Sequence, residues 1–160
     1  PTIDPKTGEP VIKILWGSQT GTAESFSNAL KGEAMNRYGL TCVSVDLERY
    51  PPEQLSRERG LLILLLATYG EGEPTDNAKD FHRWLMAAER ETPAGLLGGV
   101  RYALFGLGNK TYEYFNHMAR TCEKRLLALG ASELCPRGEG DDDANLEEDF
   151  RRWKAGSLWP

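Results

Sequence analysis

Apolar residues lie along the chain in short runs that alternate with repeats of helical spacing. Short or continuous apolar runs predict five strands, over residues 11–16, 41–45, 61–66, 101–107 and 132–135. Apolar positions three or four residues apart predict four helices, over residues 23–38, 78–88 and 115–129 and around Leu146, Phe150 and Trp153. The run at 61–66 is apolar at every position, which is typical of a strand buried on both faces of a parallel sheet.

Two helix ends carry signals of their own. Gly39 follows the apolar repeat of the first helix and predicts that this helix ends there. Asn145, with Glu148 three residues later, predicts a capping box at the start of the last helix.

The alternation of strands and helices predicts a three-layer α/β fold. Repeated strand–helix units imply parallel strands joined by right-handed crossovers, with helices on both faces of a doubly wound sheet. Five strands suit the flavodoxin-like order 2-1-3-4-5 better than the six-stranded Rossmann order. In that order a ligand lies beyond the carboxyl ends of the strands, at the switch point between strands one and three. We therefore expect function in the loops after strands one, three and four.

The length of 160 residues, with 40% hydrophobic and 27% charged residues, suits one soluble globular domain. Residues 1–10 are polar and rich in turn formers, so we expect a tail or linker there and the domain over residues 11–160. The formal net charge of −5, with lysines and arginines spread over the expected helices, disfavours nucleic acid as a partner. The longest apolar run, at 61–67, is too short to cross a bilayer, so we expect no membrane contact from this segment.

The chain has three cysteines, Cys42, Cys122 and Cys135, and no close pair of them. This odd count disfavours a disulfide framework and a zinc site, and it suits a reducing compartment. Because the cysteines fall in expected strands and on the apolar face of an expected helix, we expect all three in the core. His82 and His117 fall on expected helices, where a structural or surface role is favoured. No Ser-His-Asp arrangement and no metal site are predicted.

The loop after the first strand reads Gly-Ser-Gln-Thr-Gly-Thr-Ala, over residues 17–23. It brings hydroxyl residues and glycines to the start of a helix, where backbone N–H groups and the positive end of the dipole suit a phosphate. Hydroxyls add donors, and glycine lets the backbone approach closely. An ordinary capped turn has the same composition, so this motif alone leaves both interpretations open. The loop contains no lysine or arginine, which argues against a nucleotide-hydrolysing P-loop.

The loops after the third and fourth strands each combine glycine with tyrosine. The second loop, over residues 67–77, has Tyr69 beside Gly70, and the third loop, over residues 106–116, has Tyr112 shortly after two glycines. A tyrosine at a strand end can lie flat against a planar ligand. Each tyrosine alone is better explained by surface packing, but two such loops beside a phosphate loop favour a flat ligand. Neither loop has the third glycine of the dinucleotide-binding fingerprint.

The stretch from Glu139 to Asp149 contains seven acidic residues and no basic one. A solvated helix start explains it, because acids near a helix N-terminus interact favourably with the dipole. A docking surface for a basic partner also explains it, and the two interpretations are compatible. The spacing does not match the calcium-binding loop of an EF-hand.

Four motifs together resemble the FMN domains of the diflavin reductases, most nearly the NADPH–cytochrome P-450 reductase branch. They read Ser-Gln-Thr-Gly-Thr-Ala-Glu at residues 18–24, Ala-Thr-Tyr-Gly-Glu-Gly at 67–72, Gly-Leu-Gly-Asn-Lys-Thr-Tyr at 106–112 and Gly-Asp-Asp-Asp at 140–143. The resemblance runs in order from residue 11 to residue 159, which makes it far more specific than one glycine loop. It implies that one FMN binds non-covalently at Ser18, Gln19, Thr20, Gly21, Thr22, Ala23, Ala67, Thr68, Tyr69, Gly70, Glu71, Gly72, Leu107, Gly108, Asn109, Tyr112, Tyr114, Phe115, Asn116 and Asp142.

Within that site the resemblance implies that residues 18–23 bind the phosphate and that Tyr69 and Tyr112 sandwich the isoalloxazine ring. The Gly70 peptide is expected to turn its carbonyl toward the reduced ring, a change of φ that glycine permits without strain. No catalytic acid or base is expected from the chain, because the flavin performs the chemistry. Two residues beside the site depart from the family pattern, Trp16 replacing a smaller aromatic residue and Tyr114 replacing a frequent histidine.

The resemblance further implies an electron-transfer domain of an oxidoreductase. Such a domain relays electrons from an FAD/NADPH-binding module, outside this chain, one at a time to a haem protein such as cytochrome P-450 or cytochrome c. A basic haem protein is expected to dock on the acidic face. A place on the cytoplasmic side is implied, with an anchor to the endoplasmic reticulum outside this chain left open. A free-standing flavodoxin-type carrier is the alternative, and a flavin-free signalling domain is disfavoured because no central strand ends in a phosphoacceptor aspartate.

Overall fold

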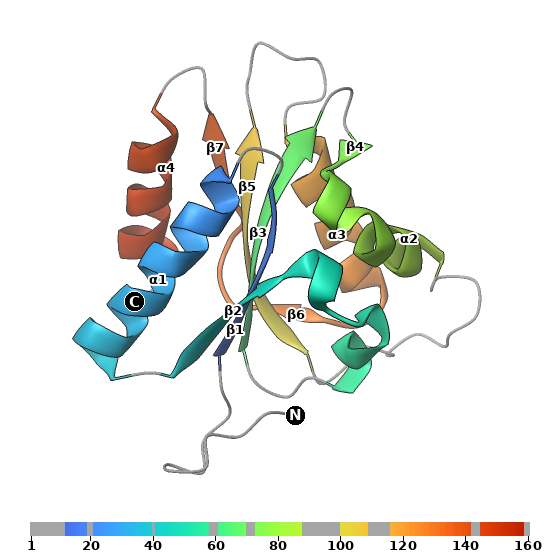
Figure 1. Ribbon diagram of the computed structural model, residues 1–160, viewed down its shortest axis with the longest axis horizontal. Helices are drawn as coiled ribbons and strands as arrows, with labels where there is room; N and C mark the ends of the chain where they lie inside the picture. Colours follow the sequence, from blue (N-terminus) through green and yellow to red (C-terminus); the bar gives the residue numbers. More distant parts are fainter. Residues whose placement is uncertain are drawn as a thin grey trace.

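The computed structural model describes residues 12–18, 21–39, 41–57, 61–69, 73–87, 100–108, 116–141 and 145–158. In this part of the chain a central sheet lies between two layers of helices (Figure 1). Its strands in chain order are β1 (Ile12–Gly17), β2 (Cys42–Asp46), β3 (Leu61–Tyr69), β4 (Glu73–Pro74), β5 (Arg101–Gly108), β6 (Ser132–Glu133) and β7 (Gly138–Asp141).

The sheet has the strand order β2-β1-β3-β5-β6, and every pairing along this path is parallel. Strand β7 also pairs with β5 in parallel, while the short β4 pairs antiparallel with β3. The predicted order 2-1-3-4-5 is therefore confirmed, with β6 and β7 sharing the fifth position. This order sets β1 beside β3 at the switch point of the sheet.

The fifth strand is not the single run that the sequence pattern predicts. Strand β6 ends at Glu133, and pairing with β5 resumes at Gly138. Pro136 lies in the gap, and proline has no N–H to donate to a strand ladder. The sheet therefore continues into the start of the acidic stretch, which the sequence alone assigned to a helix start or a docking surface.

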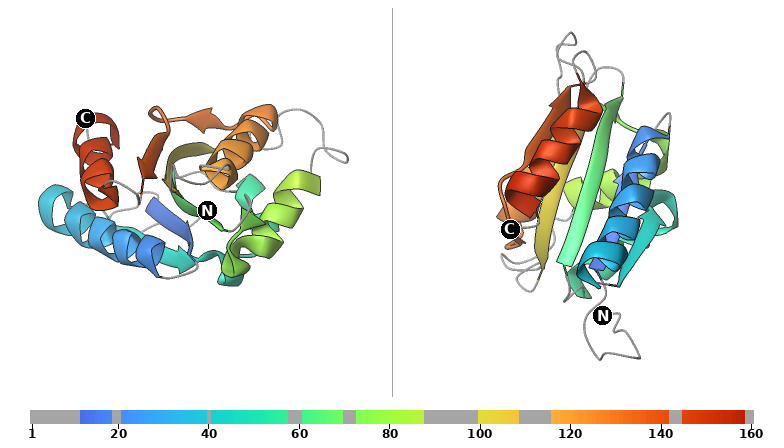
Figure 2. Two further views of the ribbon diagram at one scale, coloured as in Figure 1. Left: turned by 90° about the horizontal axis from the view of Figure 1, so that it is seen from above. Right: turned by 90° about the vertical axis from the view of Figure 1, so that its left-hand side faces the viewer.

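Helices cover both faces of the sheet. The helices α1 (Thr22–Tyr38) and α4 (Leu146–Trp153) cover one face, and α2 (Lys79–Ala87) and α3 (His117–Ala128) cover the other (Figure 2). Short turns complete the described chain: the 3₁₀ turns η1 (Leu47–Arg49), η2 (Pro52–Arg57) and η3 (Asp76–Ala78), and the π-helical turn η5 (Lys154–Leu158).

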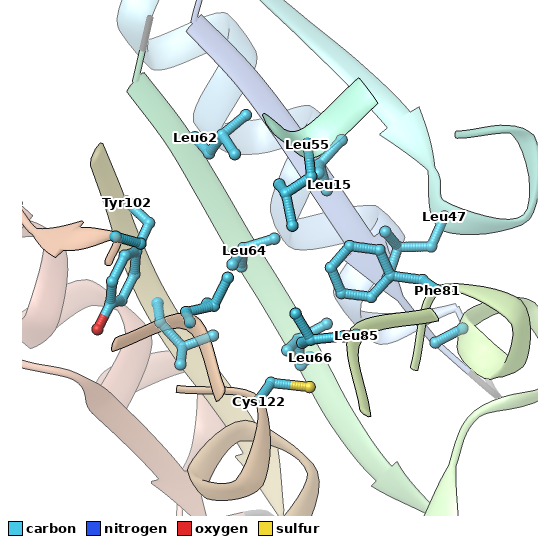
Figure 3. Close-up of a cluster of buried hydrophobic side chains, with 14 of the residues drawn as sticks. Leu15, Leu47, Leu55, Leu62, Leu64, Leu66, Phe81, Leu85, Tyr102 and Cys122 are labelled. Carbon is cyan, nitrogen blue, oxygen red and sulfur yellow. The ribbon is translucent and has the colours of Figure 1, made fainter. Parts of the chain in front are cut away.

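Side chains of β3 alternate between two hydrophobic cores. Leu62, Leu64 and Leu66 belong to the core beneath α2 and α3, shown in Figure 3. Ile63 and Leu65 belong to the core beneath α1 and α4. All five are at most 1% exposed, so the predicted burial of this strand on both faces is confirmed.

The predicted end of α1 at Gly39 is confirmed, and of the predicted capping box the Asn145 half is present. Gly39 has φ 65°, in the left-handed region, and its N–H donates to the carbonyls of Ala34 and Met35 at the end of α1. Asn145 Oδ1 accepts from the backbone N–H of Glu148 at 3.1 Å at the start of α4. The Glu148 carboxylate meets Arg151 and Arg152 on the same helix.

The three cysteines are buried and free, as predicted. Burial raises the pKa of the Cys42 thiol to about 11 and that of Cys122 to about 12. Such thiols are poor nucleophiles because the thiolate is the reactive form. Within the described residues, no helix is both long enough and apolar enough to cross a membrane.

Candidate functional site

The loops with candidate chemistry leave the sheet at one edge. Neighbouring strand ends are in register there, pairing Gly17 with Leu66, Ala67 with Leu107, and Gly108 with Asp141. Because these strands are parallel, the chain that follows each of them begins at the same carboxyl edge. The strand ends from which the four predicted ligand-site segments leave thus lie at one edge of the sheet.

The two described ends of the first loop, Ser18 and Gly21, are hydrogen-bonded to each other at the start of α1. Ser18 Oγ accepts from the backbone N–H of Gly21 at 2.8 Å. Gly21 has φ 96°, a conformation that glycine adopts without strain, and no atom lies within 4 Å of where its Cβ would be. The first backbone bond of the helix runs from Ser25 N–H to Gly21 O, so the amides from Thr22 to Glu24 precede the helical ladder. Amides in this position suit an anion.

The predicted phosphate-binding residues are only partly described. Ser18, Gly21, Thr22 and Ala23 lie within the described structure, and the Ala23 side chain is buried in the core. Gln19 and Thr20 lie outside the described residues.

The second loop leaves β3 and returns as β4. Tyr69 pairs with Glu73 and Thr68 with Pro74, so the loop between the two strands spans three residues. Thr68 Oγ1 accepts from the backbone N–H of Met118 at 3.1 Å, which ties this strand end to the start of α3. The backbone of Tyr69 ends β3 and Ala67 is half-buried. The Tyr69 side chain and the residues Gly70, Glu71 and Gly72 lie outside the described part.

The third loop ends at Asn116, which is fully buried with φ 52°. Its Nδ2 donates to the carbonyl oxygen of Gly140 at 3.2 Å, joining the start of α3 to β7. A Cβ at Gly106 or Gly108 would lie 2.7 or 2.8 Å from Asn116 Oδ1. Both glycines are therefore required for close packing against Asn116. The remaining candidates of this loop, Asn109, Tyr112, Tyr114 and Phe115, lie outside the described residues.

The acidic stretch is divided between a strand and a helix. Glu139 on β7 accepts two hydrogen bonds from Arg120, at 2.6 and 2.8 Å, and one from Arg137 at 3.1 Å. The bonds from Arg120 hold the pKa of Glu139 below its ordinary value. Asp141 is only 8% exposed, and its N–H donates to Asp149 Oδ2 at 2.9 Å.

The helix-start interpretation therefore applies to Glu147, Glu148 and Asp149, in the first turn of α4. It is wrong for Glu139 and Asp141, which lie on β7. Glu139 and Asp141 add little charge to a docking surface, because arginines pair with the first and the second is buried. Asp142 and Asp143 lie outside the described residues.

Both histidines lie on helices, as predicted. His82 is half-buried on α2, where burial and the charge of His117 lower its pKa. His117 is exposed at the start of α3, with Nε2 3.3 Å from Thr121 Oγ1. No group of three or more histidine, cysteine or acidic side chains that could hold a metal ion occurs among the described residues.

One polar residue at this edge was missed as a candidate. Asn77, in η3, accepts from the backbone N–H of Ser18 at 2.9 Å and so contacts the first loop directly. The sequence signal is the run Thr75-Asp76-Asn77 at the end of the second loop, where three polar residues precede the expected helix.

The chain is similar to known proteins over nearly its whole length. The flavodoxin family model matches residues 14–153. An NADPH–cytochrome P450 reductase of Dictyostelium discoideum is 50% identical over 153 residues, covering 96% of this chain and 22% of that protein. The human NADPH–cytochrome P450 reductase is 48% identical over 159 residues, covering 97% of this chain and 22% of the relative. The chain thus spans about a fifth of the length of these relatives.

Solved flavodoxin structures have the same fold. The flavodoxin of Streptococcus pneumoniae TIGR4 superposes with a TM-score of 0.71 at 22% identity, covering 91% of this chain and 93% of that one. Oxidised flavodoxin 1 from Bacillus cereus gives a TM-score of 0.67 at 17% identity, covering 88% and 92%. At these identities the likeness is one of fold.

Proposed function

The chain belongs to the flavodoxin family, and we propose that it is an FMN-binding electron-transfer domain of an oxidoreductase. One observation carries this proposal: Ser18 and Gly21, hydrogen-bonded to each other, lie at the start of α1, at the edge where β1, β3 and β5 end together. This edge is the ligand position of a doubly wound sheet. The other flavin-site residues are proposed from the four motifs.

The first loop has the donors that a phosphate needs. Ser18 Oγ accepts from Gly21, so its own hydrogen remains to donate to a phosphate oxygen. The amides ahead of Ser25 and the positive end of the α1 dipole add a favourable field. We assign Gln19, Thr20, Thr22 and Ala23 to the same phosphate site. The residues present therefore fit the phosphate of FMN, with its charge offset by dipoles.

The second and third loops are proposed to hold the ring. Tyr69 and Tyr112 would stack on its two faces, residues 67–72 and 107–116 would line it, and Asp142 would lie beside it. The Gly70 peptide, between the paired ends of β3 and β4, is the proposed point of backbone rotation. Bound FMN supplies the electron-carrying ring, and the chain supplies its position and its shielding from water.

The relatives suggest an electron donor and an electron acceptor for this domain. They are named NADPH–cytochrome P450 reductases, and this chain corresponds to 22% of their length. We propose that a companion FAD/NADPH module reduces this domain, and that the domain passes electrons singly to a haem protein such as cytochrome P-450 or cytochrome c. The domain would act on the cytoplasmic side, its parent tied to the endoplasmic reticulum by a segment outside this chain.

Flavin content tests the central proposal. The purified chain is expected to be yellow, with one FMN per chain that acid precipitation releases. The apoprotein is expected to regain the spectrum with FMN, and NADPH alone is expected to reduce the domain at no useful rate. A chain that takes up no FMN in a fluorescence-quenching titration would contradict the proposal. Fast NADPH oxidation by the pure domain would favour a self-sufficient reductase instead.

A free-standing flavodoxin-type carrier is the second candidate. It is favoured by the match to whole flavodoxins, of which the superposition covers 93% for the Streptococcus protein. A purified FAD/NADPH module from one of the reductase relatives separates the two functions. Rapid reduction of this domain by that module supports the reductase assignment, and reduction only by a ferredoxin-type donor supports the carrier.

A further inference from the structure

Asn77 makes four hydrogen bonds where three segments of the fold meet. Its Oδ1 accepts from Ser18 N–H at 2.9 Å and from Thr75 Oγ1 at 2.7 Å. Its Nδ2 donates to the carbonyl oxygen of Trp16 at 3.1 Å and to Asp46 Oδ1 at 2.9 Å. An asparagine side chain has two lone pairs on oxygen and two hydrogens on nitrogen, so this set uses its full capacity.

The partners also fix which way the amide points. A backbone N–H can only donate, so Ser18 must face the oxygen of Asn77. A carbonyl and a carboxylate can only accept, so Trp16 and Asp46 must face the nitrogen. The opposite orientation would place like groups together at every one of these three contacts. The orientation of Asn77 is therefore set by chemistry.

These bonds attach η3 to the carboxyl end of β1. Trp16 and Asp46 are paired neighbours at the ends of β1 and β2, and Asn77 bonds to both. Ser18 follows β1 and donates the third bond to Asn77, so the chain is fixed just before and just after Gly17. Since the Ser18 N–H donates to Asn77, the hydroxyl is the donor that Ser18 still has for a ligand.

Close packing makes this attachment rigid. A Cβ at Gly17 would lie 3.0 Å from the Cβ of Ala78 and 3.1 Å from Thr75 Oγ1. Thr75 and Ala78 are themselves at most 1% exposed, so η3 lies directly against the end of β1. A shift of Asn77 would therefore move Ser18, and through Ser18 Oγ it would move Gly21 at the start of α1.

We propose that Asn77 is a positioning residue for the phosphate of the bound flavin nucleotide: its four hydrogen bonds hold Ser18 in place, and through the Ser18–Gly21 hydrogen bond they hold both described ends of the predicted phosphate turn where they can receive the phosphate. This inference rests on the proposed function, because it assigns the FMN phosphate to that turn. Asn77 does not touch the ligand and acts through Ser18.

Aspartate at this position is the sharpest probe. Asn77→Asp keeps both acceptor contacts but loses both donors, and it brings a second carboxylate within about 3 Å of Asp46. The carbonyl of Trp16 then loses its partner. Asp46 also accepts from Glu48 N–H at 2.9 Å, so it cannot turn away without uncapping η1. The repulsion is therefore expected to displace the turn at Ser18.

FMN and riboflavin, which has the same ring and ribityl chain but no phosphate, are the two ligands for titration. Asn77→Asp is expected to weaken FMN binding about 10- to 100-fold, the range for losing one or two buried hydrogen-bond partners. Riboflavin binding is expected to change less than about threefold, because it does not use the turn. Asn28→Asp, the same change at an exposed position on α1, is the matched control and is expected to leave both affinities unchanged.

A charge swap tests the mechanism. In the double variant Asp46→Asn with Asn77→Asp, the new amide at position 46 can donate to the new carboxylate at position 77. The swap is expected to recover at least part of the FMN affinity that Asn77→Asp loses. If the two substitutions only disturbed packing, the double variant would bind FMN more weakly than Asn77→Asp alone. Hydrogen exchange gives a readout without ligand: the Ser18 amide is expected to exchange faster in Asn77→Asp than in the wild type.

The outcomes are separable. If the wild-type chain binds no FMN, the proposed function fails. If the wild type binds FMN and Asn77→Asp binds it equally well, the function stands and this inference fails. Equal losses of FMN and riboflavin, or a double variant weaker than Asn77→Asp, would also overturn a phosphate-specific positioning role.

Discussion

The hydroxyl of Tyr102 donates a hydrogen bond to Glu123 Oε2, at 3.0 Å, from the buried strand β5 to helix α3. Tyr102 is fully buried, and Figure 3 shows it on β5 within its core cluster. The other carboxylate oxygen of Glu123 meets Arg137, which also bonds to Glu139 on β7. Burial first, and the hydrogen bond to Glu123 second, raise the pKa of Tyr102 well above its ordinary value of 10.0.

Alkaline stability tests this contact. Because the folded pKa is raised, Tyr102 contributes stability that is complete below pH 10.0 and is lost as pH rises further, once the unfolded tyrosine ionises. The free energy of unfolding of the wild type is expected to fall more steeply between about pH 9 and about pH 11 than that of Tyr102→Phe, by up to about 1.4 kcal/mol per pH unit. Urea unfolding at each pH provides the measurement. Parallel curves for the two proteins would refute the assignment.

Asn116 is expected to tolerate glycine better than alanine. Both variants lose the bond to Gly140 O, but alanine also keeps the left-handed backbone at φ 52°, which costs about 1–2 kcal/mol for a residue with a Cβ. Asn116→Ala should therefore be less stable than Asn116→Gly by about 1 kcal/mol, measured by urea unfolding without ligand. Equal stabilities would mean that the backbone at 116 relaxes freely.

Gly138 is expected to accept no side chain. A Cβ there would lie 2.5 Å from Trp153 Cδ1 and 2.6 Å from Phe105 Cδ1, inside a packed aromatic cluster. Gly138→Ala should therefore lower the free energy of unfolding by at least about 1–3 kcal/mol. Gly156→Ala is the control, since nothing lies within 4 Å of its Cβ position, and it should be neutral or slightly stabilising. If the two variants are equally stable, the cluster has room to adjust.

Tyr112 is expected to matter for FMN binding far more than Tyr114. Removing a stacked ring forfeits roughly 25 cal/mol per Å² of apolar contact and a stacking contribution of about 0.5–1.5 kcal/mol. Tyr112→Ala should therefore weaken FMN binding by at least about 10-fold, while Tyr114→Phe keeps an aromatic ring and stays near wild type. Fluorescence-quenching titration measures both. An unchanged affinity for Tyr112→Ala would show that this ring does not face the flavin.

Docking of a basic haem protein is expected to depend on charge at the carboxyl edge of the sheet. Glu147 is exposed at the start of α4, near this edge. Glu133 is also exposed, but it lies on β6 opposite Tyr102, near the other end of β5, and so serves as the control position. Cytochrome c reduction by the pre-reduced domain should slow as salt rises, because exposed charges are screened beyond about 8–10 Å at physiological ionic strength. Glu147→Gln should lower the rate at low salt and flatten its salt dependence, and Glu133→Gln should change neither. Identical salt slopes for the three proteins would argue against docking near Glu147.

The hydrophobic pattern alone was enough to predict the architecture. Strand β3 is covered on both faces, which requires apolar residues at every position from 61 to 66. The composition of this run therefore predicts its burial. Gly39 and Asn145 signal helix ends because capping depends on residues within one turn. The motifs likewise indicated the flavodoxin-like family. Their assignments at Gln19, Gly70, Tyr112 and Asp142 stay predictions, since these residues lie outside the described structure.

Only the tertiary structure decided the contacts between segments that are distant in the sequence. Strand β7 has no apolar alternation, and it exists because Gly138 and Gly140 let the chain lie against Phe105. In the sequence Glu139 is one of seven acids in a charged stretch, and nothing in that stretch indicates a partner. In the structure Arg120 of α3 forms an ion pair with it. Asn77 meets Ser18 across 59 positions of sequence. A polar side chain carries no periodic signal of its partner, because a hydrogen bond depends on the position and direction of both groups, and only the packed sheet and helices fix these.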